Sequence, residues 1–165
     1  MSELIDKLSS YNLFNYLLPG TVFVFLVEAM TSHSLVHDNL IVAAFMFYFI
    51  GLIISRIGSI FIEPALKIIS KHVTYKDYIK ASDEDDMIKI LSEQNNVYRT
   101  AIAMLLAVFM MLFYDYIALR YPDFTMMFQL IVLALMTLLF VLAYRKQTKY
   151  IVMRVEARLD KSSDH

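Results

Sequence analysis

The segment that decides the fold is residues 40–62, LIVAAFMFYFIGLIISRIGSIFI, in which Arg56 is the only charged residue. A helix needs about 20 mostly apolar residues to cross the ~30 Å hydrocarbon core of a bilayer, and this segment supplies them. The alternative is a thick buried helix of a soluble bundle, but helices of that kind show a polar stripe. Residues 40–55 contain no charge at all, so we predict a transmembrane helix.

Three further segments have the same character and are predicted to span the bilayer: residues 13–30, 100–119 and 124–144. Of the 165 residues 59% are hydrophobic, against about 45–50% in soluble domains, and only 3 Gly and 3 Pro interrupt the chain. We therefore predict an all-α polytopic membrane protein with four transmembrane helices and a small helical cytoplasmic part. Residues 1–165 form one membrane domain, and we expect it to assemble as a homo-oligomer.

The distribution of Lys and Arg predicts the orientation in the membrane, because cytoplasmic loops carry an excess of these residues. Thirteen of them lie before the first span, between spans two and three, or after span four: Lys7, Lys67, Lys71, Lys76, Lys80, Lys89, Arg99, Arg145, Lys146, Lys149, Arg154, Arg158 and Lys161. In the expected outer loops there is only Arg120. We predict that both termini and the connector, residues 63–99, are cytoplasmic.

The connector is predicted to be largely helical. The second helix should continue inward through Ile69, beyond Pro64, which fixes a first-turn dihedral or a kink. A new helix is expected to begin at Ser82, because the three residues behind this cap are acidic and favour the N-terminal dipole. Asn95 and Asn96 are expected to end it before the third span.

The fourth helix is expected to continue beyond the membrane, because residues 125–159 contain no Gly or Pro. This cytoplasmic extension and its tail cover residues 145–165. Ile151, Val155 and Leu159 recur every four residues and form an apolar stripe. We expect the stripe to pack against the connector or a neighbouring subunit. The cytoplasmic part as a whole is too small for an enzyme domain of its own.

Arg56 and the Pro19-Gly20 pair are candidates for gating. Arg56 either snorkels to the lipid headgroups or forms an ion pair, with Glu63 or with a neighbour, at a gate. Pro19-Gly20 falls about two turns into the first span and frees backbone groups there, so it indicates either a structural kink or a gating hinge. Small residues recur at every fourth position of the second span and allow close helix packing: Gly51, Ser55 and Ser59.

Acidic residues gather near the outer ends of the predicted spans: Glu28, Asp38, Asp115 and Asp123. On a monomer these residues form a polar rim. In a symmetric oligomer they recur as acidic rings, which attract cations at a pore mouth. On the second interpretation, Glu28 and Asp115 line an outer vestibule.

Basic and aromatic residues mix on the cytoplasmic side. The topology signal and contact with anionic lipid explain the basic residues nearest the membrane. The topology signal and lipid contact explain less well four cations that lie farther from the membrane: Lys76, Lys80, Arg154 and Arg158. With Tyr98 and Arg99, these cations would suit phosphate neutralisation and base stacking. We therefore predict that the six residues bind a nucleotide or a short oligonucleotide.

The sequence carries no catalytic constellation. It has no Cys, which excludes thiolate nucleophiles and cysteine-bound metal sites. It also lacks a phosphate-binding Gly loop, an HExxH motif and a Ser–His–Asp set in a convincing context. We therefore predict no enzymatic activity, no cofactor and no metal site.

Three stretches of the chain carry a resemblance to a known family: Asn15-Tyr16-Leu17-Leu18-Pro19-Gly20, then Ser55-Arg56-Ile57-Gly58-Ser59-Ile60 with Glu63-Pro64, then Asn95-Asn96-Val97-Tyr98-Arg99-Thr100. They resemble small four-span bacterial membrane proteins encoded beside anti-phage systems, in particular the Hailong-type effectors partnered with nucleotidyltransferases. The resemblance implies a tetrameric channel of the inner membrane, held shut until a nucleotide oligomer made by the partner enzyme binds inside. Opening would depolarise the cell and stop phage replication.

The leading hypothesis is a ligand-gated, ion-conducting membrane effector of bacterial anti-phage defence. One alternative is a non-conducting membrane anchor that recruits a cytosolic partner through the stripe of Ile151, Val155 and Leu159. Another is a small proton-coupled transporter with Glu28 as its proton carrier, although a coupling carboxylate usually lies near the midplane of the membrane.

Overall fold

The computed structural model describes residues 13–70, 73–121 and 125–163, and every regular element in these ranges is a helix. The elements in chain order are η1 (Leu13–Leu17), α2 (Leu18–Met30), α3 (Leu40–Ile57), η2 (Gly58–Ile62), α4 (Glu63–Ile69), α5 (Tyr75–Glu84), α6 (Asp86–Arg120) and α7 (Thr125–Ser163). Of these, η1 and η2 are single π-helical turns. The all-α prediction is confirmed for the described part of the chain, although Phe124, the first residue of the fourth predicted span, lies outside it.

Within the described ranges, three helical segments are long and apolar enough to cross a membrane: Leu40–Ile69, Asp86–Arg120 and Met127–Glu156. A fourth apolar helix, Asn15–Met30, is shorter. Large apolar side chains are exposed along all four, as at Phe109, which is 63% exposed. Such surfaces suit contact with lipid or with other protein chains. Three apolar helices of this length are what a membrane protein needs, and the number of four spans stays a prediction.

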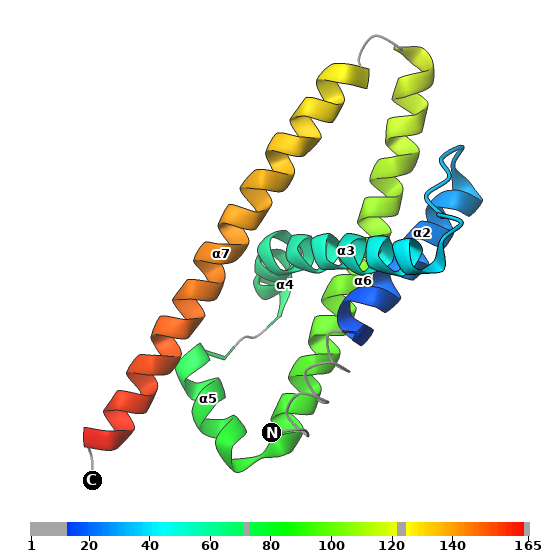
Figure 1. Cartoon of the computed structure of the whole chain (residues 1–165). Coiled ribbons are helices and arrows are strands. Elements are labelled where there is room, and N and C mark those ends of the chain that lie inside the picture. The colour runs from blue at the N-terminus through cyan, green and yellow to red at the C-terminus, as the bar shows by residue number, and fades with distance from the viewer. Residues whose placement is uncertain (1–12, 71–72, 122–124, 164–165) are drawn as a thin grey trace.

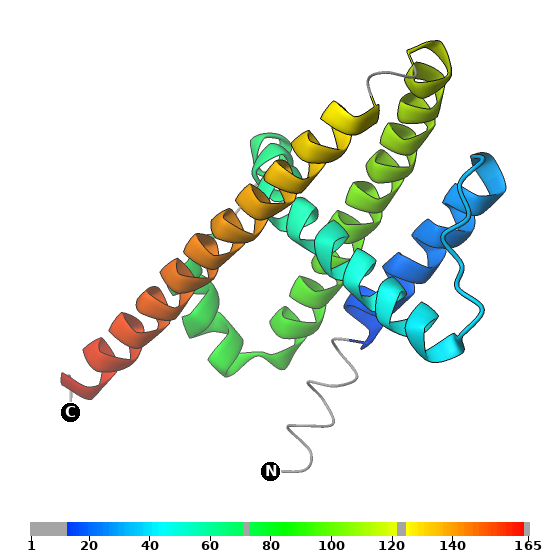
Figure 2. The same ribbon diagram turned by 45° about the horizontal axis from the view of Figure 1, so that its top comes forward.

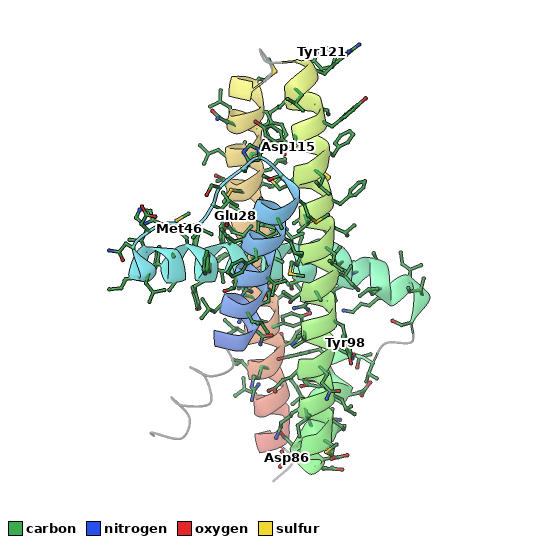
Figure 3. All side chains as sticks on the ribbon, turned by 90° about the vertical axis from the view of Figure 1, so that its right-hand side faces the viewer. Glu28, Met46, Asp86, Tyr98, Asp115 and Tyr121 are labelled. Atoms are coloured by element: carbon green, nitrogen blue, oxygen red, sulfur yellow. The ribbon has the colours of Figure 1, made fainter. Side chains whose placement is uncertain are left out.

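The long helices do not form a parallel bundle. In Figure 1, α6 and α7 run along the length of the molecule, and α3 crosses α6 at a steep angle and ends beside α7. Figure 3, seen from the side, shows the same crossing, and Figure 2 shows α2 beside α3 and α6. The buried core lies where α2, α3 and α6 meet, and it consists of Phe23, Val24, Val27, Ile54, Ala103 and Val108. This small core leaves most of the apolar surface of α7 uncovered.

The α2 and α3 helices touch backbone to backbone at a pair of glycines. A Cβ added at Gly20 would overlap the carbonyl oxygen of Phe47, and one added at Gly51 would overlap that of Tyr16. Backbone atoms cannot move aside by changing rotamer, so any side chain at either position forces the helices apart. The predicted close packing on this face is confirmed within the chain, where Ser55 is also buried.

Each π-helical turn precedes a proline. The last residue of η1 lies two positions before Pro19, and that of η2 two positions before Pro64. Proline has no N–H for the carbonyl four residues earlier, and its ring clashes with that carbonyl. A widened turn relieves the clash, and the Glu63 N–H accordingly bonds to the Gly58 carbonyl five residues back. The helix then continues through Pro64 to Ile69, as predicted.

Two predicted helix boundaries in the connector are wrong. The α6 helix begins after Asp85, whose carboxylate accepts a hydrogen bond from the Met87 N–H at 2.9 Å, whereas Ser82 lies inside α5. Asp and Ser are nearly equal as N-terminal caps, so the sequence could not choose between them. The α6 helix also continues through Asn95 and Asn96. Asn costs less than about 1 kcal/mol in a helix interior, which continuous backbone hydrogen bonding outweighs.

The α7 helix continues without a break, as predicted, but its apolar stripe does not pack on the connector. Ile151, Val155 and Leu159 are 56%, 52% and 63% exposed. The contact between α5 and α7 instead involves Tyr75 and Tyr150, whose ring centres are 4.8 Å apart. Packing of the stripe against a neighbouring subunit stays a prediction.

Candidate functional site

A cavity of about 1320 Å³ lies among η2, α4, α5, α6 and α7. Tyr16 of η1 and Arg56 of α3 contribute to one side of it. Because the walls come from segments far apart in the sequence, the cavity exists only in the folded chain.

The cavity wall is strongly basic. Its described lining residues include five cationic side chains, which are Arg56, Lys67, Arg99, Lys146 and Lys149, and a single carboxylate, that of Glu63. Charges in partly desolvated surroundings interact more strongly than in bulk water. A hollow with this imbalance therefore attracts anions.

The carboxylate of Glu63 joins three helices. Oε1 accepts a hydrogen bond from Lys67 Nζ at 2.8 Å, and Oε2 accepts from Arg99 at 2.8 Å and from Lys146 at 2.7 Å. Lys67 lies one turn along α4, whereas Arg99 lies on α6 and Lys146 on α7. We call Glu63 with these three cations the Glu63 cluster. The Glu63 side chain is only 20% exposed, so the cluster links α4, α6 and α7 in partly desolvated surroundings.

Lys146 has further partners in the π-helical turn. Its Nζ donates to the Ser59 hydroxyl at 2.9 Å and also to the Ser59 carbonyl. That carbonyl has no ordinary helical donor, because the Glu63 N–H bonds to Gly58 and Pro64 has no N–H. The widened turn therefore supplies an acceptor that the lysine of α7 satisfies.

One buried donor of the Glu63 cluster has no acceptor within the part of the chain that the structure describes. This donor is Nε of Arg99. The Arg99 side chain is 16% exposed, and its bond to Glu63 comes from Nη1. A guanidinium commonly binds a carboxylate or phosphate through two parallel bonds. Leaving Nε unpaired costs free energy unless a ligand oxygen or a water molecule accepts from it.

Tyrosine rings lie between the cations on the cavity wall. Tyr75 of α5 packs against Tyr150 of α7, and its ring centre is 6.3 Å from that of Tyr78. Lys146 Nζ lies 5.8 Å from the centre of the Tyr150 ring. Tyr98, labelled in Figure 3, also lines the cavity. Aromatic faces beside cations suit a ligand that carries both planar rings and negative charge.

Arg56 lies at the cavity but does not pair with Glu63, so that alternative is wrong for this structure. Its Nη2 instead donates to the Tyr16 hydroxyl at 2.8 Å, and its guanidinium carbon is 6.0 Å from the Tyr16 ring centre. This contact joins α3 to η1 just before Pro19 and Gly20. The three residues predicted to act in gating thus belong to two helices that are coupled at the cavity. Their role in gating stays a prediction.

Two of the six predicted ligand-binding residues, Tyr98 and Arg99, line the cavity. Three others are exposed and lie outside its lining, namely Lys76, Lys80 and Arg154. The side chain of the sixth, Arg158, lies outside the described part of the chain. The structure therefore separates the predicted set into a cavity pair and an exposed group.

Sequence reasoning did not include Glu63, Lys67, Lys146 or Lys149 among the ligand-binding residues. It attributed the three lysines to the topology signal, because they lie close to a predicted span. The informative residue is Glu63, a lone acid at the inner end of a span. An ionised carboxylate at this depth is costly unless it is paired. Its position could have indicated that cations from other helices converge on it.

The predicted vestibule residues lie toward the opposite end of the molecule, above Tyr98 in Figure 3. Asp115 Oδ1 lies 2.6 Å from His33 Nε2. Glu28 is exposed and accepts a hydrogen bond from the Ser34 hydroxyl at 3.1 Å. Both acids therefore hold the loop that follows α2, and a role in lining a pore stays a prediction.

No group of three or more possible metal ligands occurs among the described residues. The chain matches no protein-family model, no curated protein and no solved structure. The functional interpretation therefore depends on the chemistry of the cavity and of the elements around it.

Proposed function

We propose that this protein is a ligand-gated ion-conducting effector of the bacterial inner membrane, opened by a nucleotide or oligonucleotide that binds in the basic cavity. The observation that carries the proposal is a hollow of about 1320 Å³ whose described lining includes five cations, one carboxylate and several tyrosine rings. Following the family resemblance, we further propose a homotetramer with cytoplasmic termini that acts in anti-phage defence. Its ligand would be the product of a partner nucleotidyltransferase.

The chemistry of the cavity favours phosphate groups joined to planar rings. Arg binds phosphate through paired hydrogen bonds and Lys binds it as a point charge, while aromatic faces stack on bases. Pockets for small ligands measure about 300–1,000 Å³, so this cavity has room for more than one nucleotide. An anionic lipid headgroup would satisfy the cations, but it offers no planar ring to Tyr75 or Tyr150.

The cavity borders the elements that would have to move during gating. Tyr16 and Arg56 on its wall belong to η1 and α3, which are joined by their hydrogen bond close to the crossing of Gly20 and Gly51. The π-helical turns η1 and η2 both contribute to the wall, and such turns are frequent at functional sites. A ligand that displaces Arg56 therefore acts directly on the packing of α2 against α3.

The ion path is proposed to lie between subunits. A single chain buries few apolar side chains and leaves many large ones exposed, which leaves surface for contact with other copies as well as with lipid. In a symmetric assembly Glu28 and Asp115 would recur around the axis near one end. Rings of carboxylates attract cations, so we propose a path that prefers cations.

The test is ion flux from liposomes that carry the purified protein, with a panel of cyclic and linear oligonucleotides. We expect one oligonucleotide to release ions at low concentration. Lys149→Glu, on the cavity wall, should raise the concentration needed by about tenfold. Lys89→Glu, an exposed lysine outside the cavity lining, should leave it unchanged. Absence of flux with every oligonucleotide, in protein shown to be folded and oriented, would refute ligand-gated conduction.

A second candidate function is that of a non-conducting anchor that recruits a cytosolic partner. It is favoured by the exposed stripe of Ile151, Val155 and Leu159. This function predicts co-purification of a stoichiometric partner, loss of that partner in Val155→Glu, and liposomes without flux. Proton-coupled transport is favoured least, because Glu28 is exposed near the end of α2 rather than enclosed near its middle.

A further inference from the structure

The Glu63 cluster has more positive charge than its carboxylate can neutralise. Lys67, Arg99 and Lys146 all donate to Glu63 within 2.7–2.8 Å, so three cations share one negative charge. Arg56 and Lys149 add to the surplus on the same wall. A phosphate group, with more oxygens and more charge than a carboxylate, would satisfy these cations more completely.

An independent observation also indicates a missing acceptor at this place. Nε of Arg99 is buried without a hydrogen-bond partner among the described residues, although the same guanidinium donates to Glu63. A second oxygen beside the first would convert this single bond into a paired one. Glu63 does not provide that oxygen in this structure, where its Oε1 bonds to Lys67 at 2.8 Å and Nε of Arg99 is left without a partner among the described residues.

We propose that Glu63 is an internal substitute for a phosphate of the ligand, and that the two compete for Arg99 and Lys146. This inference rests on the proposed function in one respect, namely that the cavity binds an anion. When a phosphate enters, Glu63 leaves the cations of α6 and α7 but keeps Lys67, which lies one turn away on its own helix. The displaced carboxylate is thus not left unpaired. Ligand binding and the link from α4 to α6 and α7 are then mutually exclusive.

If Glu63 and a phosphate compete for the same cations, a substitution of Glu63 should change the affinity for a polyanion in a predictable direction. Glu63→Gln removes the competing charge and retains the shape of the side chain, so a polyanion should bind more tightly. A merely structural role for Glu63 predicts the opposite, because the cations would lose the group that positions them. We would titrate inorganic tripolyphosphate into the full-length protein in nanodiscs and measure binding calorimetrically at constant ionic strength.

We expect Glu63→Gln to bind tripolyphosphate about tenfold more tightly than the unchanged protein. Glu84→Gln makes the same chemical change at an exposed residue of α5 outside the cavity lining and should leave the affinity unchanged. Equal or weaker binding by Glu63→Gln, or no binding to any of the three proteins, would overturn the proposal.

A second measurement leaves Glu63 in place. The chain has no Cys, so Ile68→Cys on α4 and Tyr144→Cys on α7 provide the only two sites for spin labels in each chain. Both positions are largely exposed, at 86% and 73%. Saturating tripolyphosphate should change the distance distribution between the labels, and Glu63→Gln should show the changed distribution without it. An unchanged distribution at saturation would overturn the proposal.

The two proposals fail in different ways. Tighter binding by Glu63→Gln together with absence of flux for every oligonucleotide would refute conduction and support displacement of Glu63. Oligonucleotide-gated flux together with unchanged or weaker binding by Glu63→Gln would refute displacement and leave gating in place.

Discussion

Replacing Gly51 by Ala should destabilise the protein, although Ala is the better helix former. The propensity gain is about 1 kcal/mol. Against it, the new Cβ would overlap the Tyr16 carbonyl oxygen and would lie 3.0 Å from the Gly20 nitrogen. Overpacking costs about 1–3 kcal/mol even where side chains can adjust. Here only backbone atoms oppose the methyl group, so we expect a cost near 3 kcal/mol and a net loss of about 2 kcal/mol.

The matched control is Gly58→Ala, seven residues further along the same helical segment. Its Cβ would lie 3.3 Å from the Arg99 carbonyl oxygen and 3.4 Å from the Arg99 Cγ, a contact that a shift of a few tenths of an ångström relieves. We expect a net change within about 0.5 kcal/mol, because the propensity gain offsets the contact. Both variants would be unfolded by denaturant in the same detergent. Equal losses at Gly51 and Gly58 would refute the crossing as the cause.

Three further outcomes are expected. Lys146→Met removes one of the three described partners of Glu63. It should lower the free energy of unfolding by about 1–3 kcal/mol in the same detergent assay. A loss below about 0.5 kcal/mol would contradict the contacts described for the Glu63 cluster. The double change Lys80→Glu with Arg154→Glu alters exposed residues outside the cavity. The oligonucleotide concentration for half-maximal flux should therefore change less than about threefold. Loss of flux would show that the ligand binds to the exposed surface instead. Asp115→Asn weakens the contact with His33, worth less than about 1 kcal/mol, and should speed amide hydrogen exchange in residues 31–39 without changing global stability. Unchanged exchange there would show that the contact does not hold the loop.

Hydropathy was sufficient to find the apolar helices, because their apolar runs are long and uninterrupted. The second predicted span, residues 40–62, lies within the observed apolar segment Leu40–Ile69. The close contact of α2 with α3 could not be predicted in the same way. It depends on Gly20 meeting Gly51, and a sequence shows that both residues are small without showing that they touch. Small-residue spacing identified the face of α3 but not its partner.

The sequence indicated the chemical character of the candidate site, but only some of the residues that line it. Charge and aromatic content indicated a basic, tyrosine-bearing surface, and two residues of the predicted set, Tyr98 and Arg99, line the cavity. The sequence argument assigned ligand binding to basic residues far from the membrane, and this favoured exposed residues such as Lys80 over Lys146. The decisive property of Lys146 is its contact with Glu63 of another helix, which depends on how α4 and α7 pack. Local sequence carries no information on that packing.

The π-helical turn η2 also determines how α4, which follows it, is rotated about the helix axis relative to α3. Each residue of an α-helix turns the chain by about 100° and advances it by about 1.5 Å. A π-helical turn takes in one more residue than the α-helical turn it replaces, so relaxation of Gly58–Ile62 to α geometry would rotate α4 by about 100° relative to α3. That rotation would carry Glu63 and Lys67 away from Arg99 and Lys146. The π-helical geometry of Gly58–Ile62 therefore determines which face α4 presents to α6 and α7.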